Sequence, residues 1–249
     1  MGIRFGALIV LALVLPACGG GGNDPAPPGV TKHPGSIGAT TAIFPHTLND
    51  MGTHETELGD LVADAMRVRY GTQLAFQNGW GIRASLPAGG VLPADLTLRR
   101  PDAGYAAGPP YDLVVQDVGV MLPFGDTVIT RTVTGTQIWA MLELGFSLYP
   151  GNNNGFPQIS GFTVTFKASN AAGSRVLSVV LDGGAVVLNN ASTYTFATNN
   201  FINAGGDGYT MLNDGQGTVR EVLADVVVDH IGILGTITPS IAGRIVVVP

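Results

Sequence analysis

Glycine and proline occur so often in this chain that they limit its fold to short elements joined by tight turns. The 249 residues include 36 glycines and 16 prolines, and both residue types favour turns over the interior of helices and strands. This content favours a strand-rich or mixed fold over a helical bundle. With 45% hydrophobic residues, the chain also has enough apolar material to bury the core of one large domain or two small ones.

Three segments have the apolar spacing of amphipathic helices: 55–69, 134–148 and 218–234. The first carries an apolar stripe formed by Leu58, Leu61, Val62, Ala65 and Met66. The other two begin with a threonine and a glutamine or glutamate in capping-box spacing, Thr134 with Gln137 and Thr218 with Glu221. In a capping box each side chain bonds the backbone N–H of the other residue, so these pairs predict two helix starts. Each segment is most simply a helix that packs on the core.

Runs of alternating or β-branched residues lie between the helical segments and predict strands at 127–133, 161–168, 175–182, 193–199 and 244–248. Asp182, Gly183 and Gly184 have the composition of a hairpin turn. Because helices and strands are interleaved and hairpins also occur, we expect an α/β (α+β) fold, a mixed sheet with packed helices. Residues 98–112 are rich in Gly, Pro and Ala and predict an exposed inserted loop.

The first residues, "MGIRFGALIVLALVLPACGGGGN", predict export. Their apolar run is too short to span a bilayer and fits a signal peptide, and "LPAC" resembles a bacterial lipobox. Cys18 is the only cysteine, so it forms no internal disulfide and is a candidate for lipid attachment. We expect a signal peptide with lipobox at 1–18, a flexible linker at 19–32 and a domain at 33–249. An ordinary cleaved secretory signal is the alternative.

The predicted location is therefore the bacterial cell envelope, with the chain held on a membrane through lipidated Cys18 and its domain in the periplasm or at the cell surface. Binding to nucleic acid is not expected. Lys and Arg number 12 against 18 Asp and Glu, and the basic residues form no run longer than Arg99–Arg100. Neutralising a phosphate backbone needs clustered cations.

Six segments occur in an order that matches one family: "ETELGDLVADAMR", "NGWGIRASLPAGGV", "LPFGDTVITRTVTG", "ISGFTVTF", "AGSRVLSVVL" and "NNFINAGGDGYTML". Together they resemble the C-terminal, substrate-binding domain of the 5'-nucleotidase/UDP-sugar hydrolase family. The resemblance covers roughly residues 33–249, and six ordered motifs are far more specific than any single one. It implies a 5'-nucleotidase C-terminal domain-like fold and a nucleotide or nucleoside as the ligand, in nucleotide catabolism.

The resemblance also implies roles for individual residues. By motif position, Phe124 and Phe201 stack on the two faces of a base, and Asp207 accepts hydrogen bonds from ribose hydroxyls. Asn78 offers a donor and an acceptor to a base edge, and Arg83 offers a planar cation to ribose and phosphate. The alternatives are ordinary structural roles: core phenylalanines, an asparagine that caps its glycine turn, and an arginine paired with a surface carboxylate.

Three further residues, Gly205, Gly206 and Asp126, complete the expected site. Gly205 and Gly206 tolerate positive φ, so they predict a tight turn that presents Asp207, with Phe201 and Tyr209 nearby. Asp126 stands where the family more usually has Asn or Gly, and it is either at the rim of the site or a turn residue.

The sequence departs from the family pattern at two positions. Gly52 stands where the family often has an arginine, so one cation that would face phosphate is missing. Trp80 replaces the middle glycine of the "NGGGIR" motif, and its ring could narrow the pocket or add a stacking surface.

The family hydrolyses phosphate esters in a separate N-terminal domain that holds two metal ions. Such a centre needs several His and Asp ligands, whereas the four histidines here lie in none of its motifs. We therefore expect no catalytic residue, no metal ligand and no cofactor in this chain, with divalent metals present only if a partner supplies that domain. Three hypotheses stay open: a tethered nucleotide-binding or nucleoside-binding module, a hydrolase component completed by a separate metallophosphoesterase chain, and a structural envelope protein with a degenerate pocket.

Overall fold

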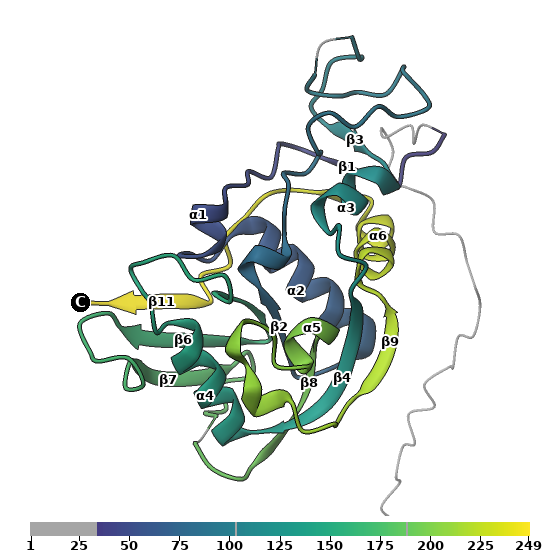
Figure 1. Ribbon diagram of the computed structural model, residues 1–249. Helices are drawn as coiled ribbons and strands as arrows, with labels where there is room; N and C mark the ends of the chain where they lie inside the picture. The colour runs from purple at the N-terminus through teal and green to yellow at the C-terminus, as the bar shows by residue number, and fades with distance from the viewer. Residues whose placement is uncertain (1–33, 103, 188) are drawn as a thin grey trace, which may run out of the picture. The chain divides into compact units, whose positions relative to one another are not determined.

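The computed structural model describes residues 34–102, 104–187 and 189–249. The predicted signal peptide, lipobox and linker lie outside these residues. Figure 1 shows a mixed α/β arrangement in which helices pack against a central sheet. The α/β prediction is confirmed, and the strands form several separate sheets. Within the described residues no helix is both long and apolar enough to cross a membrane.

The central sheet has five strands in the order β5-β2-β8-β4-β9. Strands β2 and β8 are parallel, and the other neighbouring pairs are antiparallel. The strands are β2 (Leu74–Asn78), β4 (Thr127–Thr134), β5 (Pro157–Ser160), β8 (Thr193–Asn199) and β9 (Thr218–Val222). This mixture of directions fits a chain that uses both long crossovers and hairpins.

The two faces of the central sheet bury different side chains because successive strand residues point to opposite sides. On one face, Ala75 of β2 belongs to a core with helices α2 (Glu57–Tyr70) and α6 (Leu223–Leu234). On the other face, Leu74 and Phe76 belong to a second core that includes helix α4 (Gly135–Gly145). The apolar stripe predicted for segment 55–69, which forms α2, is buried.

Two smaller sheets flank the central one. The first has the order β11-β6-β7 and comprises β6 (Phe162–Lys167), β7 (Val176–Leu181) and β11 (Ile245–Val248). The second has the order β10-β1-β3 and comprises β1 (Gly38–Thr40), β3 (Tyr111–Leu113) and β10 (Thr236–Ile237). The remaining helical segments are α1 (Leu48–Met51), α3 (Val115–Met121), α5 (Asn200–Asn203), η1 (Gly79–Gly81), η2 (Gly206–Gly208) and η3 (Thr210–Leu212).

One of the two predicted capping boxes is confirmed and the other is wrong. Thr134 and Gln137 cap α4 reciprocally, with N···O distances of 2.9 and 3.1 Å. Thr218 instead begins strand β9, which pairs with β4, and α6 starts only at Leu223. The carboxylate of Glu221 accepts from Arg69 at 2.7 Å rather than from a helix N-terminus.

The expected exposure of residues 98–112 is wrong at both ends of the segment. Arg100 and Asp112 are only 2% and 1% exposed. Arg100 donates two hydrogen bonds of 2.7 Å to Asp117 of α3, and both side chains of this ion pair are buried. Asp117 also accepts from the backbone of Ala88 and Val114. This satisfied buried carboxylate fixes the segment to α3.

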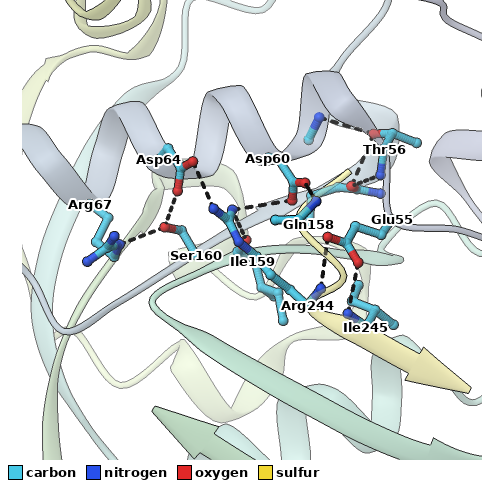
Figure 2. A network of polar contacts seen from close by, with 12 residues as sticks. Glu55, Thr56, Asp60, Asp64, Arg67, Gln158, Ile159, Ser160, Arg244 and Ile245 are labelled. Atoms are coloured by element: carbon cyan, nitrogen blue, oxygen red, sulfur yellow. Dashed lines mark hydrogen bonds and ion pairs between the residues drawn. The ribbon is translucent and has the colours of Figure 1, made fainter. Parts of the chain in front are cut away.

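The last strand is tied to α2 by a polar network (Figure 2). Asp60 and Asp64 project from α2 toward the guanidinium of Arg244, which lies 3.2 and 2.8 Å from their carboxylate oxygens. Glu55 accepts the backbone N–H groups of Arg244 and Ile245, each at 2.9 Å. The network therefore joins the start of α2 to the start of β11.

Candidate functional site

Two exposed phenylalanines from different elements line one cavity of about 300 Å³. Phe124 and Phe201 are 60% and 45% exposed, whereas most phenylalanines of the chain belong to the buried cores. The cavity is bounded by Asn78, Trp80, Gly81, Arg83, Phe124, Asp126, Asn154, Phe201 and Asp207. Its volume is within the range of small-molecule sites. Six of the predicted site residues thus lie together, whereas Gly205 and Gly206, which directly precede Asp207 in the chain, do not line the cavity.

Phe124 lies in the turn between α3 and β4. Gly125 adopts a φ of +68°, which an L side chain rarely accepts, so the glycine allows the chain to reverse directly after the ring. The guanidinium carbon of Arg83 lies 5.8 Å from the centre of the Phe124 ring, a cation–π contact. The alternative of a core phenylalanine is excluded at this position by its exposure.

Phe201 is presented by the short helix α5. Asn199 caps this helix, its side-chain oxygen accepting from the backbone N–H of Ile202 at 2.8 Å. Gly206 lies against the Phe201 ring, because a Cβ atom at this position would be 2.5 Å from a ring carbon. The glycine pair therefore has two separate roles: Gly205 adopts a φ of +89° in the turn, and Gly206 leaves room for the ring.

Asp207 occupies the left-handed region of backbone conformation, with a φ of 51°. A non-glycine residue in this region costs conformational energy and is found where the surrounding structure imposes it. The Asp207 carboxylate accepts a 2.9 Å hydrogen bond from the side-chain amide of Asn78. Burial raises the pKa of Asp207, and the bond from Asn78 lowers it in part. The strained turn thus holds a partly buried carboxylate at the cavity.

The side chain of Asn78, expected to contact a base edge, lines the cavity and is already held by hydrogen bonds to other side chains. It is only 4% exposed, and its oxygen accepts from Asn199 at 2.9 Å and from Gln77 at 3.2 Å. Its amide nitrogen donates to Asp207. The side chain also makes no cap bond to its own glycine turn. Asn78 therefore connects Asn199, the cap of α5, to the Asp207 carboxylate.

Arg83 and Asp126 both line the cavity but differ in exposure. Arg83 is exposed, donates to the backbone oxygen of Trp80 at 3.5 Å and forms no ion pair with any described residue. Asp126 is half-buried, and burial raises the pKa of its carboxyl. Among the residues that the structure describes, its side chain has no hydrogen-bond partner. Asp126 is thus a cavity residue as well as a turn residue.

The two departures from the family pattern, Trp80 and Gly52, are connected through the backbone oxygen of Leu48 and the side chain of Asn152. Trp80 lines the cavity, and its indole N–H donates to the backbone oxygen of Leu48 at 2.9 Å. Asn152 donates to the same oxygen at 3.1 Å. Its side-chain oxygen would lie 2.1 Å from a Cβ atom on Gly52. A neutral amide therefore fills the space beside Gly52, and a longer side chain there would require Asn152 to move.

Sequence reasoning missed Asn154 and Gly81 as lining residues. Tyr209 lies close to Asp207, as expected, but does not line the cavity. The backbone oxygen of Asn154 accepts the backbone N–H of Trp80 at 3.0 Å, which joins the loop before β5 to the cavity wall. Nothing in the run "GNNNG" distinguishes Asn154 from its two neighbouring asparagines, so the sequence did not predict this contact. Tyr209 is fully buried and makes an edge contact with Phe76 at 5.0 Å, so it belongs to the core.

Within the described residues, no group of three or more His, Cys, Asp or Glu side chains is placed to hold a metal ion. The three described histidines are separated. His46 contacts the backbone oxygen of Ile82 at 3.0 Å, and His54 contacts the Thr53 hydroxyl at 2.7 Å. His230 lies in α6, where burial lowers its pKa.

The mixed sheet and its packed helices define an α/β domain that carries a cavity lined by two exposed phenylalanines. The family model described as "5'-nucleotidase, C-terminal domain" matches residues 36–214. The chain therefore belongs to the 5'-nucleotidase C-terminal domain family.

Curated relatives and solved structures agree with this assignment. The trifunctional nucleotide phosphoesterase protein YfkN of Bacillus subtilis is 31% identical over 219 residues, which cover 84% of this chain and 14% of that protein. The crystal structure of a 5'-nucleotidase precursor from Thermus thermophilus is 31% identical, with a TM-score of 0.70, over 86% of this chain and 40% of that one. Haemophilus influenzae NAD nucleotidase shares the fold, with a TM-score of 0.65 at 18% identity, over 86% of this chain and 38% of that one. This chain thus spans well under half of these relatives.

Proposed function

We propose that this chain binds nucleosides or nucleotides, with the base held between the rings of Phe124 and Phe201. One observation carries the proposal: two phenylalanines that a folding chain would normally bury are exposed on the same cavity. Every base has a π-face, and stacking of a base on an aromatic ring contributes about 1–3 kcal/mol. The membership of the family and the nucleotide-related names of its relatives support this ligand class.

Asp207 provides the second element of recognition. A carboxylate only accepts hydrogen bonds, and the two hydroxyls of a ribose are donors. The hydrogen bond from Asn78 and the left-handed turn hold this acceptor in place before a ligand arrives. A preorganised acceptor loses little freedom on binding, which favours affinity.

The proposed role is recognition rather than bond cleavage. Hydrolysis of a phosphate ester by a two-metal mechanism needs a cluster of ligands, and the described residues place no such cluster together. We propose that any hydrolysis which uses this site depends on a metal centre in another domain or another chain. We further propose export and anchoring through Cys18 at the cell envelope, on the basis of the lipobox-like "LPAC" alone.

A calorimetric titration of the purified chain with adenosine, guanosine, cytidine, uridine and their 5'-monophosphates tests the ligand class. The proposal expects saturable binding of at least one of these compounds, and no binding by any of the eight would contradict it. A phosphate-release assay with AMP and added Mn²⁺ tests the second part. Turnover by the pure chain alone would overturn the recognition-only role.

A further inference from the structure

Among the residues that line the cavity, negatively charged side chains outnumber positively charged ones. Asp126 and Asp207 supply two carboxylates, whereas Arg83 is the one cation among the described lining residues. Both carboxylates are about half-buried, and burial raises the pKa of each. Two partly desolvated negative groups on one small cavity repel a further anion, and solvent screens this repulsion less than it does at an open surface.

Arg83 offsets only part of this charge. Its guanidinium lies over the Phe124 ring and its other contact within the described residues is the backbone oxygen of Trp80, and the side chain is exposed to solvent. The attraction between an exposed cation and an anion is weakened by water and screened by salt.

The described residues beside Trp80 and Gly52 supply no second cation. Gly52 has no side chain, and the amide of Asn152 occupies the space that one would need. That amide donates to the backbone oxygen of Leu48, which also accepts from the Trp80 indole. The space beside Gly52 is therefore filled by a neutral amide.

We infer that the cavity selects the uncharged nucleoside over its 5'-phosphate, with Asp126 as the residue that determines this selectivity. The inference rests on the proposed function and narrows its ligand class. The carboxylate of Asp126 has no hydrogen-bond partner within the described residues, so it is free to accept from an amino or imino group of a base or from a hydroxyl. It repels a phosphate that approaches the same cavity. The reaction class that supplies such a ligand is the removal of phosphate from a nucleotide.

Paired titrations test the inference. Each of the four nucleosides and its 5'-monophosphate is titrated into the purified chain at low ionic strength, and for the best-binding base we expect the nucleoside to bind about tenfold more tightly or better. The preference should shrink when the salt concentration rises to about 0.5 M. Equal or tighter binding of the monophosphate overturns the inference but leaves the proposed function intact. No binding by any of the eight compounds overturns both.

The variant Asp126→Asn removes the charge without changing the size of the side chain. We expect the ratio of monophosphate to nucleoside affinity to rise by about tenfold. Asp182→Asn is the matched control, because Asp182 is exposed, carries the same charge and does not line the cavity. An unchanged ratio in Asp126→Asn, or an equal change in Asp182→Asn, would contradict the assigned role of Asp126.

Discussion

The amide of Asn78 donates to the carboxylate of Asp207 across 2.9 Å, although 129 positions separate the two residues. Asn199 donates to the other end of the same amide at 2.9 Å and also caps the helix that carries Phe201. The hydrogen-bonded amides of Asn78 and Asn199 therefore fix the positions of both the Asp207 carboxylate and the helix that carries Phe201. A change to these amides should affect the binding site and the stability of the fold together.

The first prediction concerns Asn78. Replacing it with alanine leaves the buried side-chain donor of Asn199 short of one acceptor and frees the Asp207 carboxylate to move. We expect Asn78→Ala to lower the free energy of unfolding by about 1–3 kcal/mol, the cost of an unsatisfied buried polar group, and to weaken nucleoside binding. Urea unfolding and calorimetry measure the two effects. Unchanged values of both would show that these amides have no such role.

The second prediction concerns Gly206. A methyl group there would meet the Phe201 ring at 2.5 Å, and because that ring is 45% exposed, it can move aside. Gly206→Ala should therefore weaken binding by roughly 1–2 kcal/mol, part of one stacking contact, with little loss of thermal stability. Gly183→Ala is the control, because a Cβ at Gly183 meets no atom within 4 Å. Full affinity in Gly206→Ala would exclude the proposed position of the ring.

Much of this arrangement could be predicted from local patterns, and the failures have a common physical origin. The capping box at Thr134 lies where neighbouring residues alone decide the structure, and it forms. The similar pair at Thr218 and Glu221 fails because residues far away in the chain compete for it. Strand β4 offers an unpaired edge to Thr218, and Arg69 binds the Glu221 carboxylate. Tertiary contacts commonly override such local preferences.

The candidate site shows the same contrast between features that local patterns predict and contacts that form only between distant segments. The order of the motifs predicted that Phe124, Phe201 and Asp207 share one site, and all three line one cavity. A motif specifies residue types and their spacing. It does not record that the oxygen of Asn78 is taken by Asn199, which is 121 positions away. Nor does it show that Asn152 fills the space beside Gly52. Contacts between distant segments became visible only in the folded chain.

The third prediction is a pH dependence of stability that involves Asp60. Burial is the largest cause that raises its pKa, from 3.8 to about 7, and the neighbouring carboxylate of Glu55 adds to the effect while Arg244 opposes it. The folded chain then keeps a proton that the unfolded chain releases, so this stabilisation is complete below about pH 4 and is lost as the pH rises through about 7.

Thermal melts between about pH 5 and pH 8 check this dependence. The melting temperature of the parent chain should fall over this interval more than that of Asp60→Asn. Asp64, Arg244 and His230 face the same region and are unchanged in the variant, so the difference between the two profiles isolates Asp60. Parallel profiles would contradict the raised pKa.

The fourth prediction concerns the proposed anchor at Cys18, the only cysteine of the chain. If this thiol carries the lipid, Cys18→Ser should leave the protein soluble or as an unprocessed precursor, since a hydroxyl does not accept the thioether-linked lipid. Fractionation of bacterial cells that express each form is the measurement. Equal amounts of both forms in the membrane fraction would refute lipid attachment at this position.

The most direct test of the account is a titration of two single variants, Phe124→Ala and Phe201→Ala, with the nucleoside that the parent chain binds best. Each change should weaken binding by about 1–3 kcal/mol, and the melting temperature should stay nearly constant because both rings are exposed. Phe156→Ala, at a residue only 1% exposed, provides the contrast and should cost about 3–5 kcal/mol of stability. Full affinity in both single variants would contradict the claim that the base lies between these two rings.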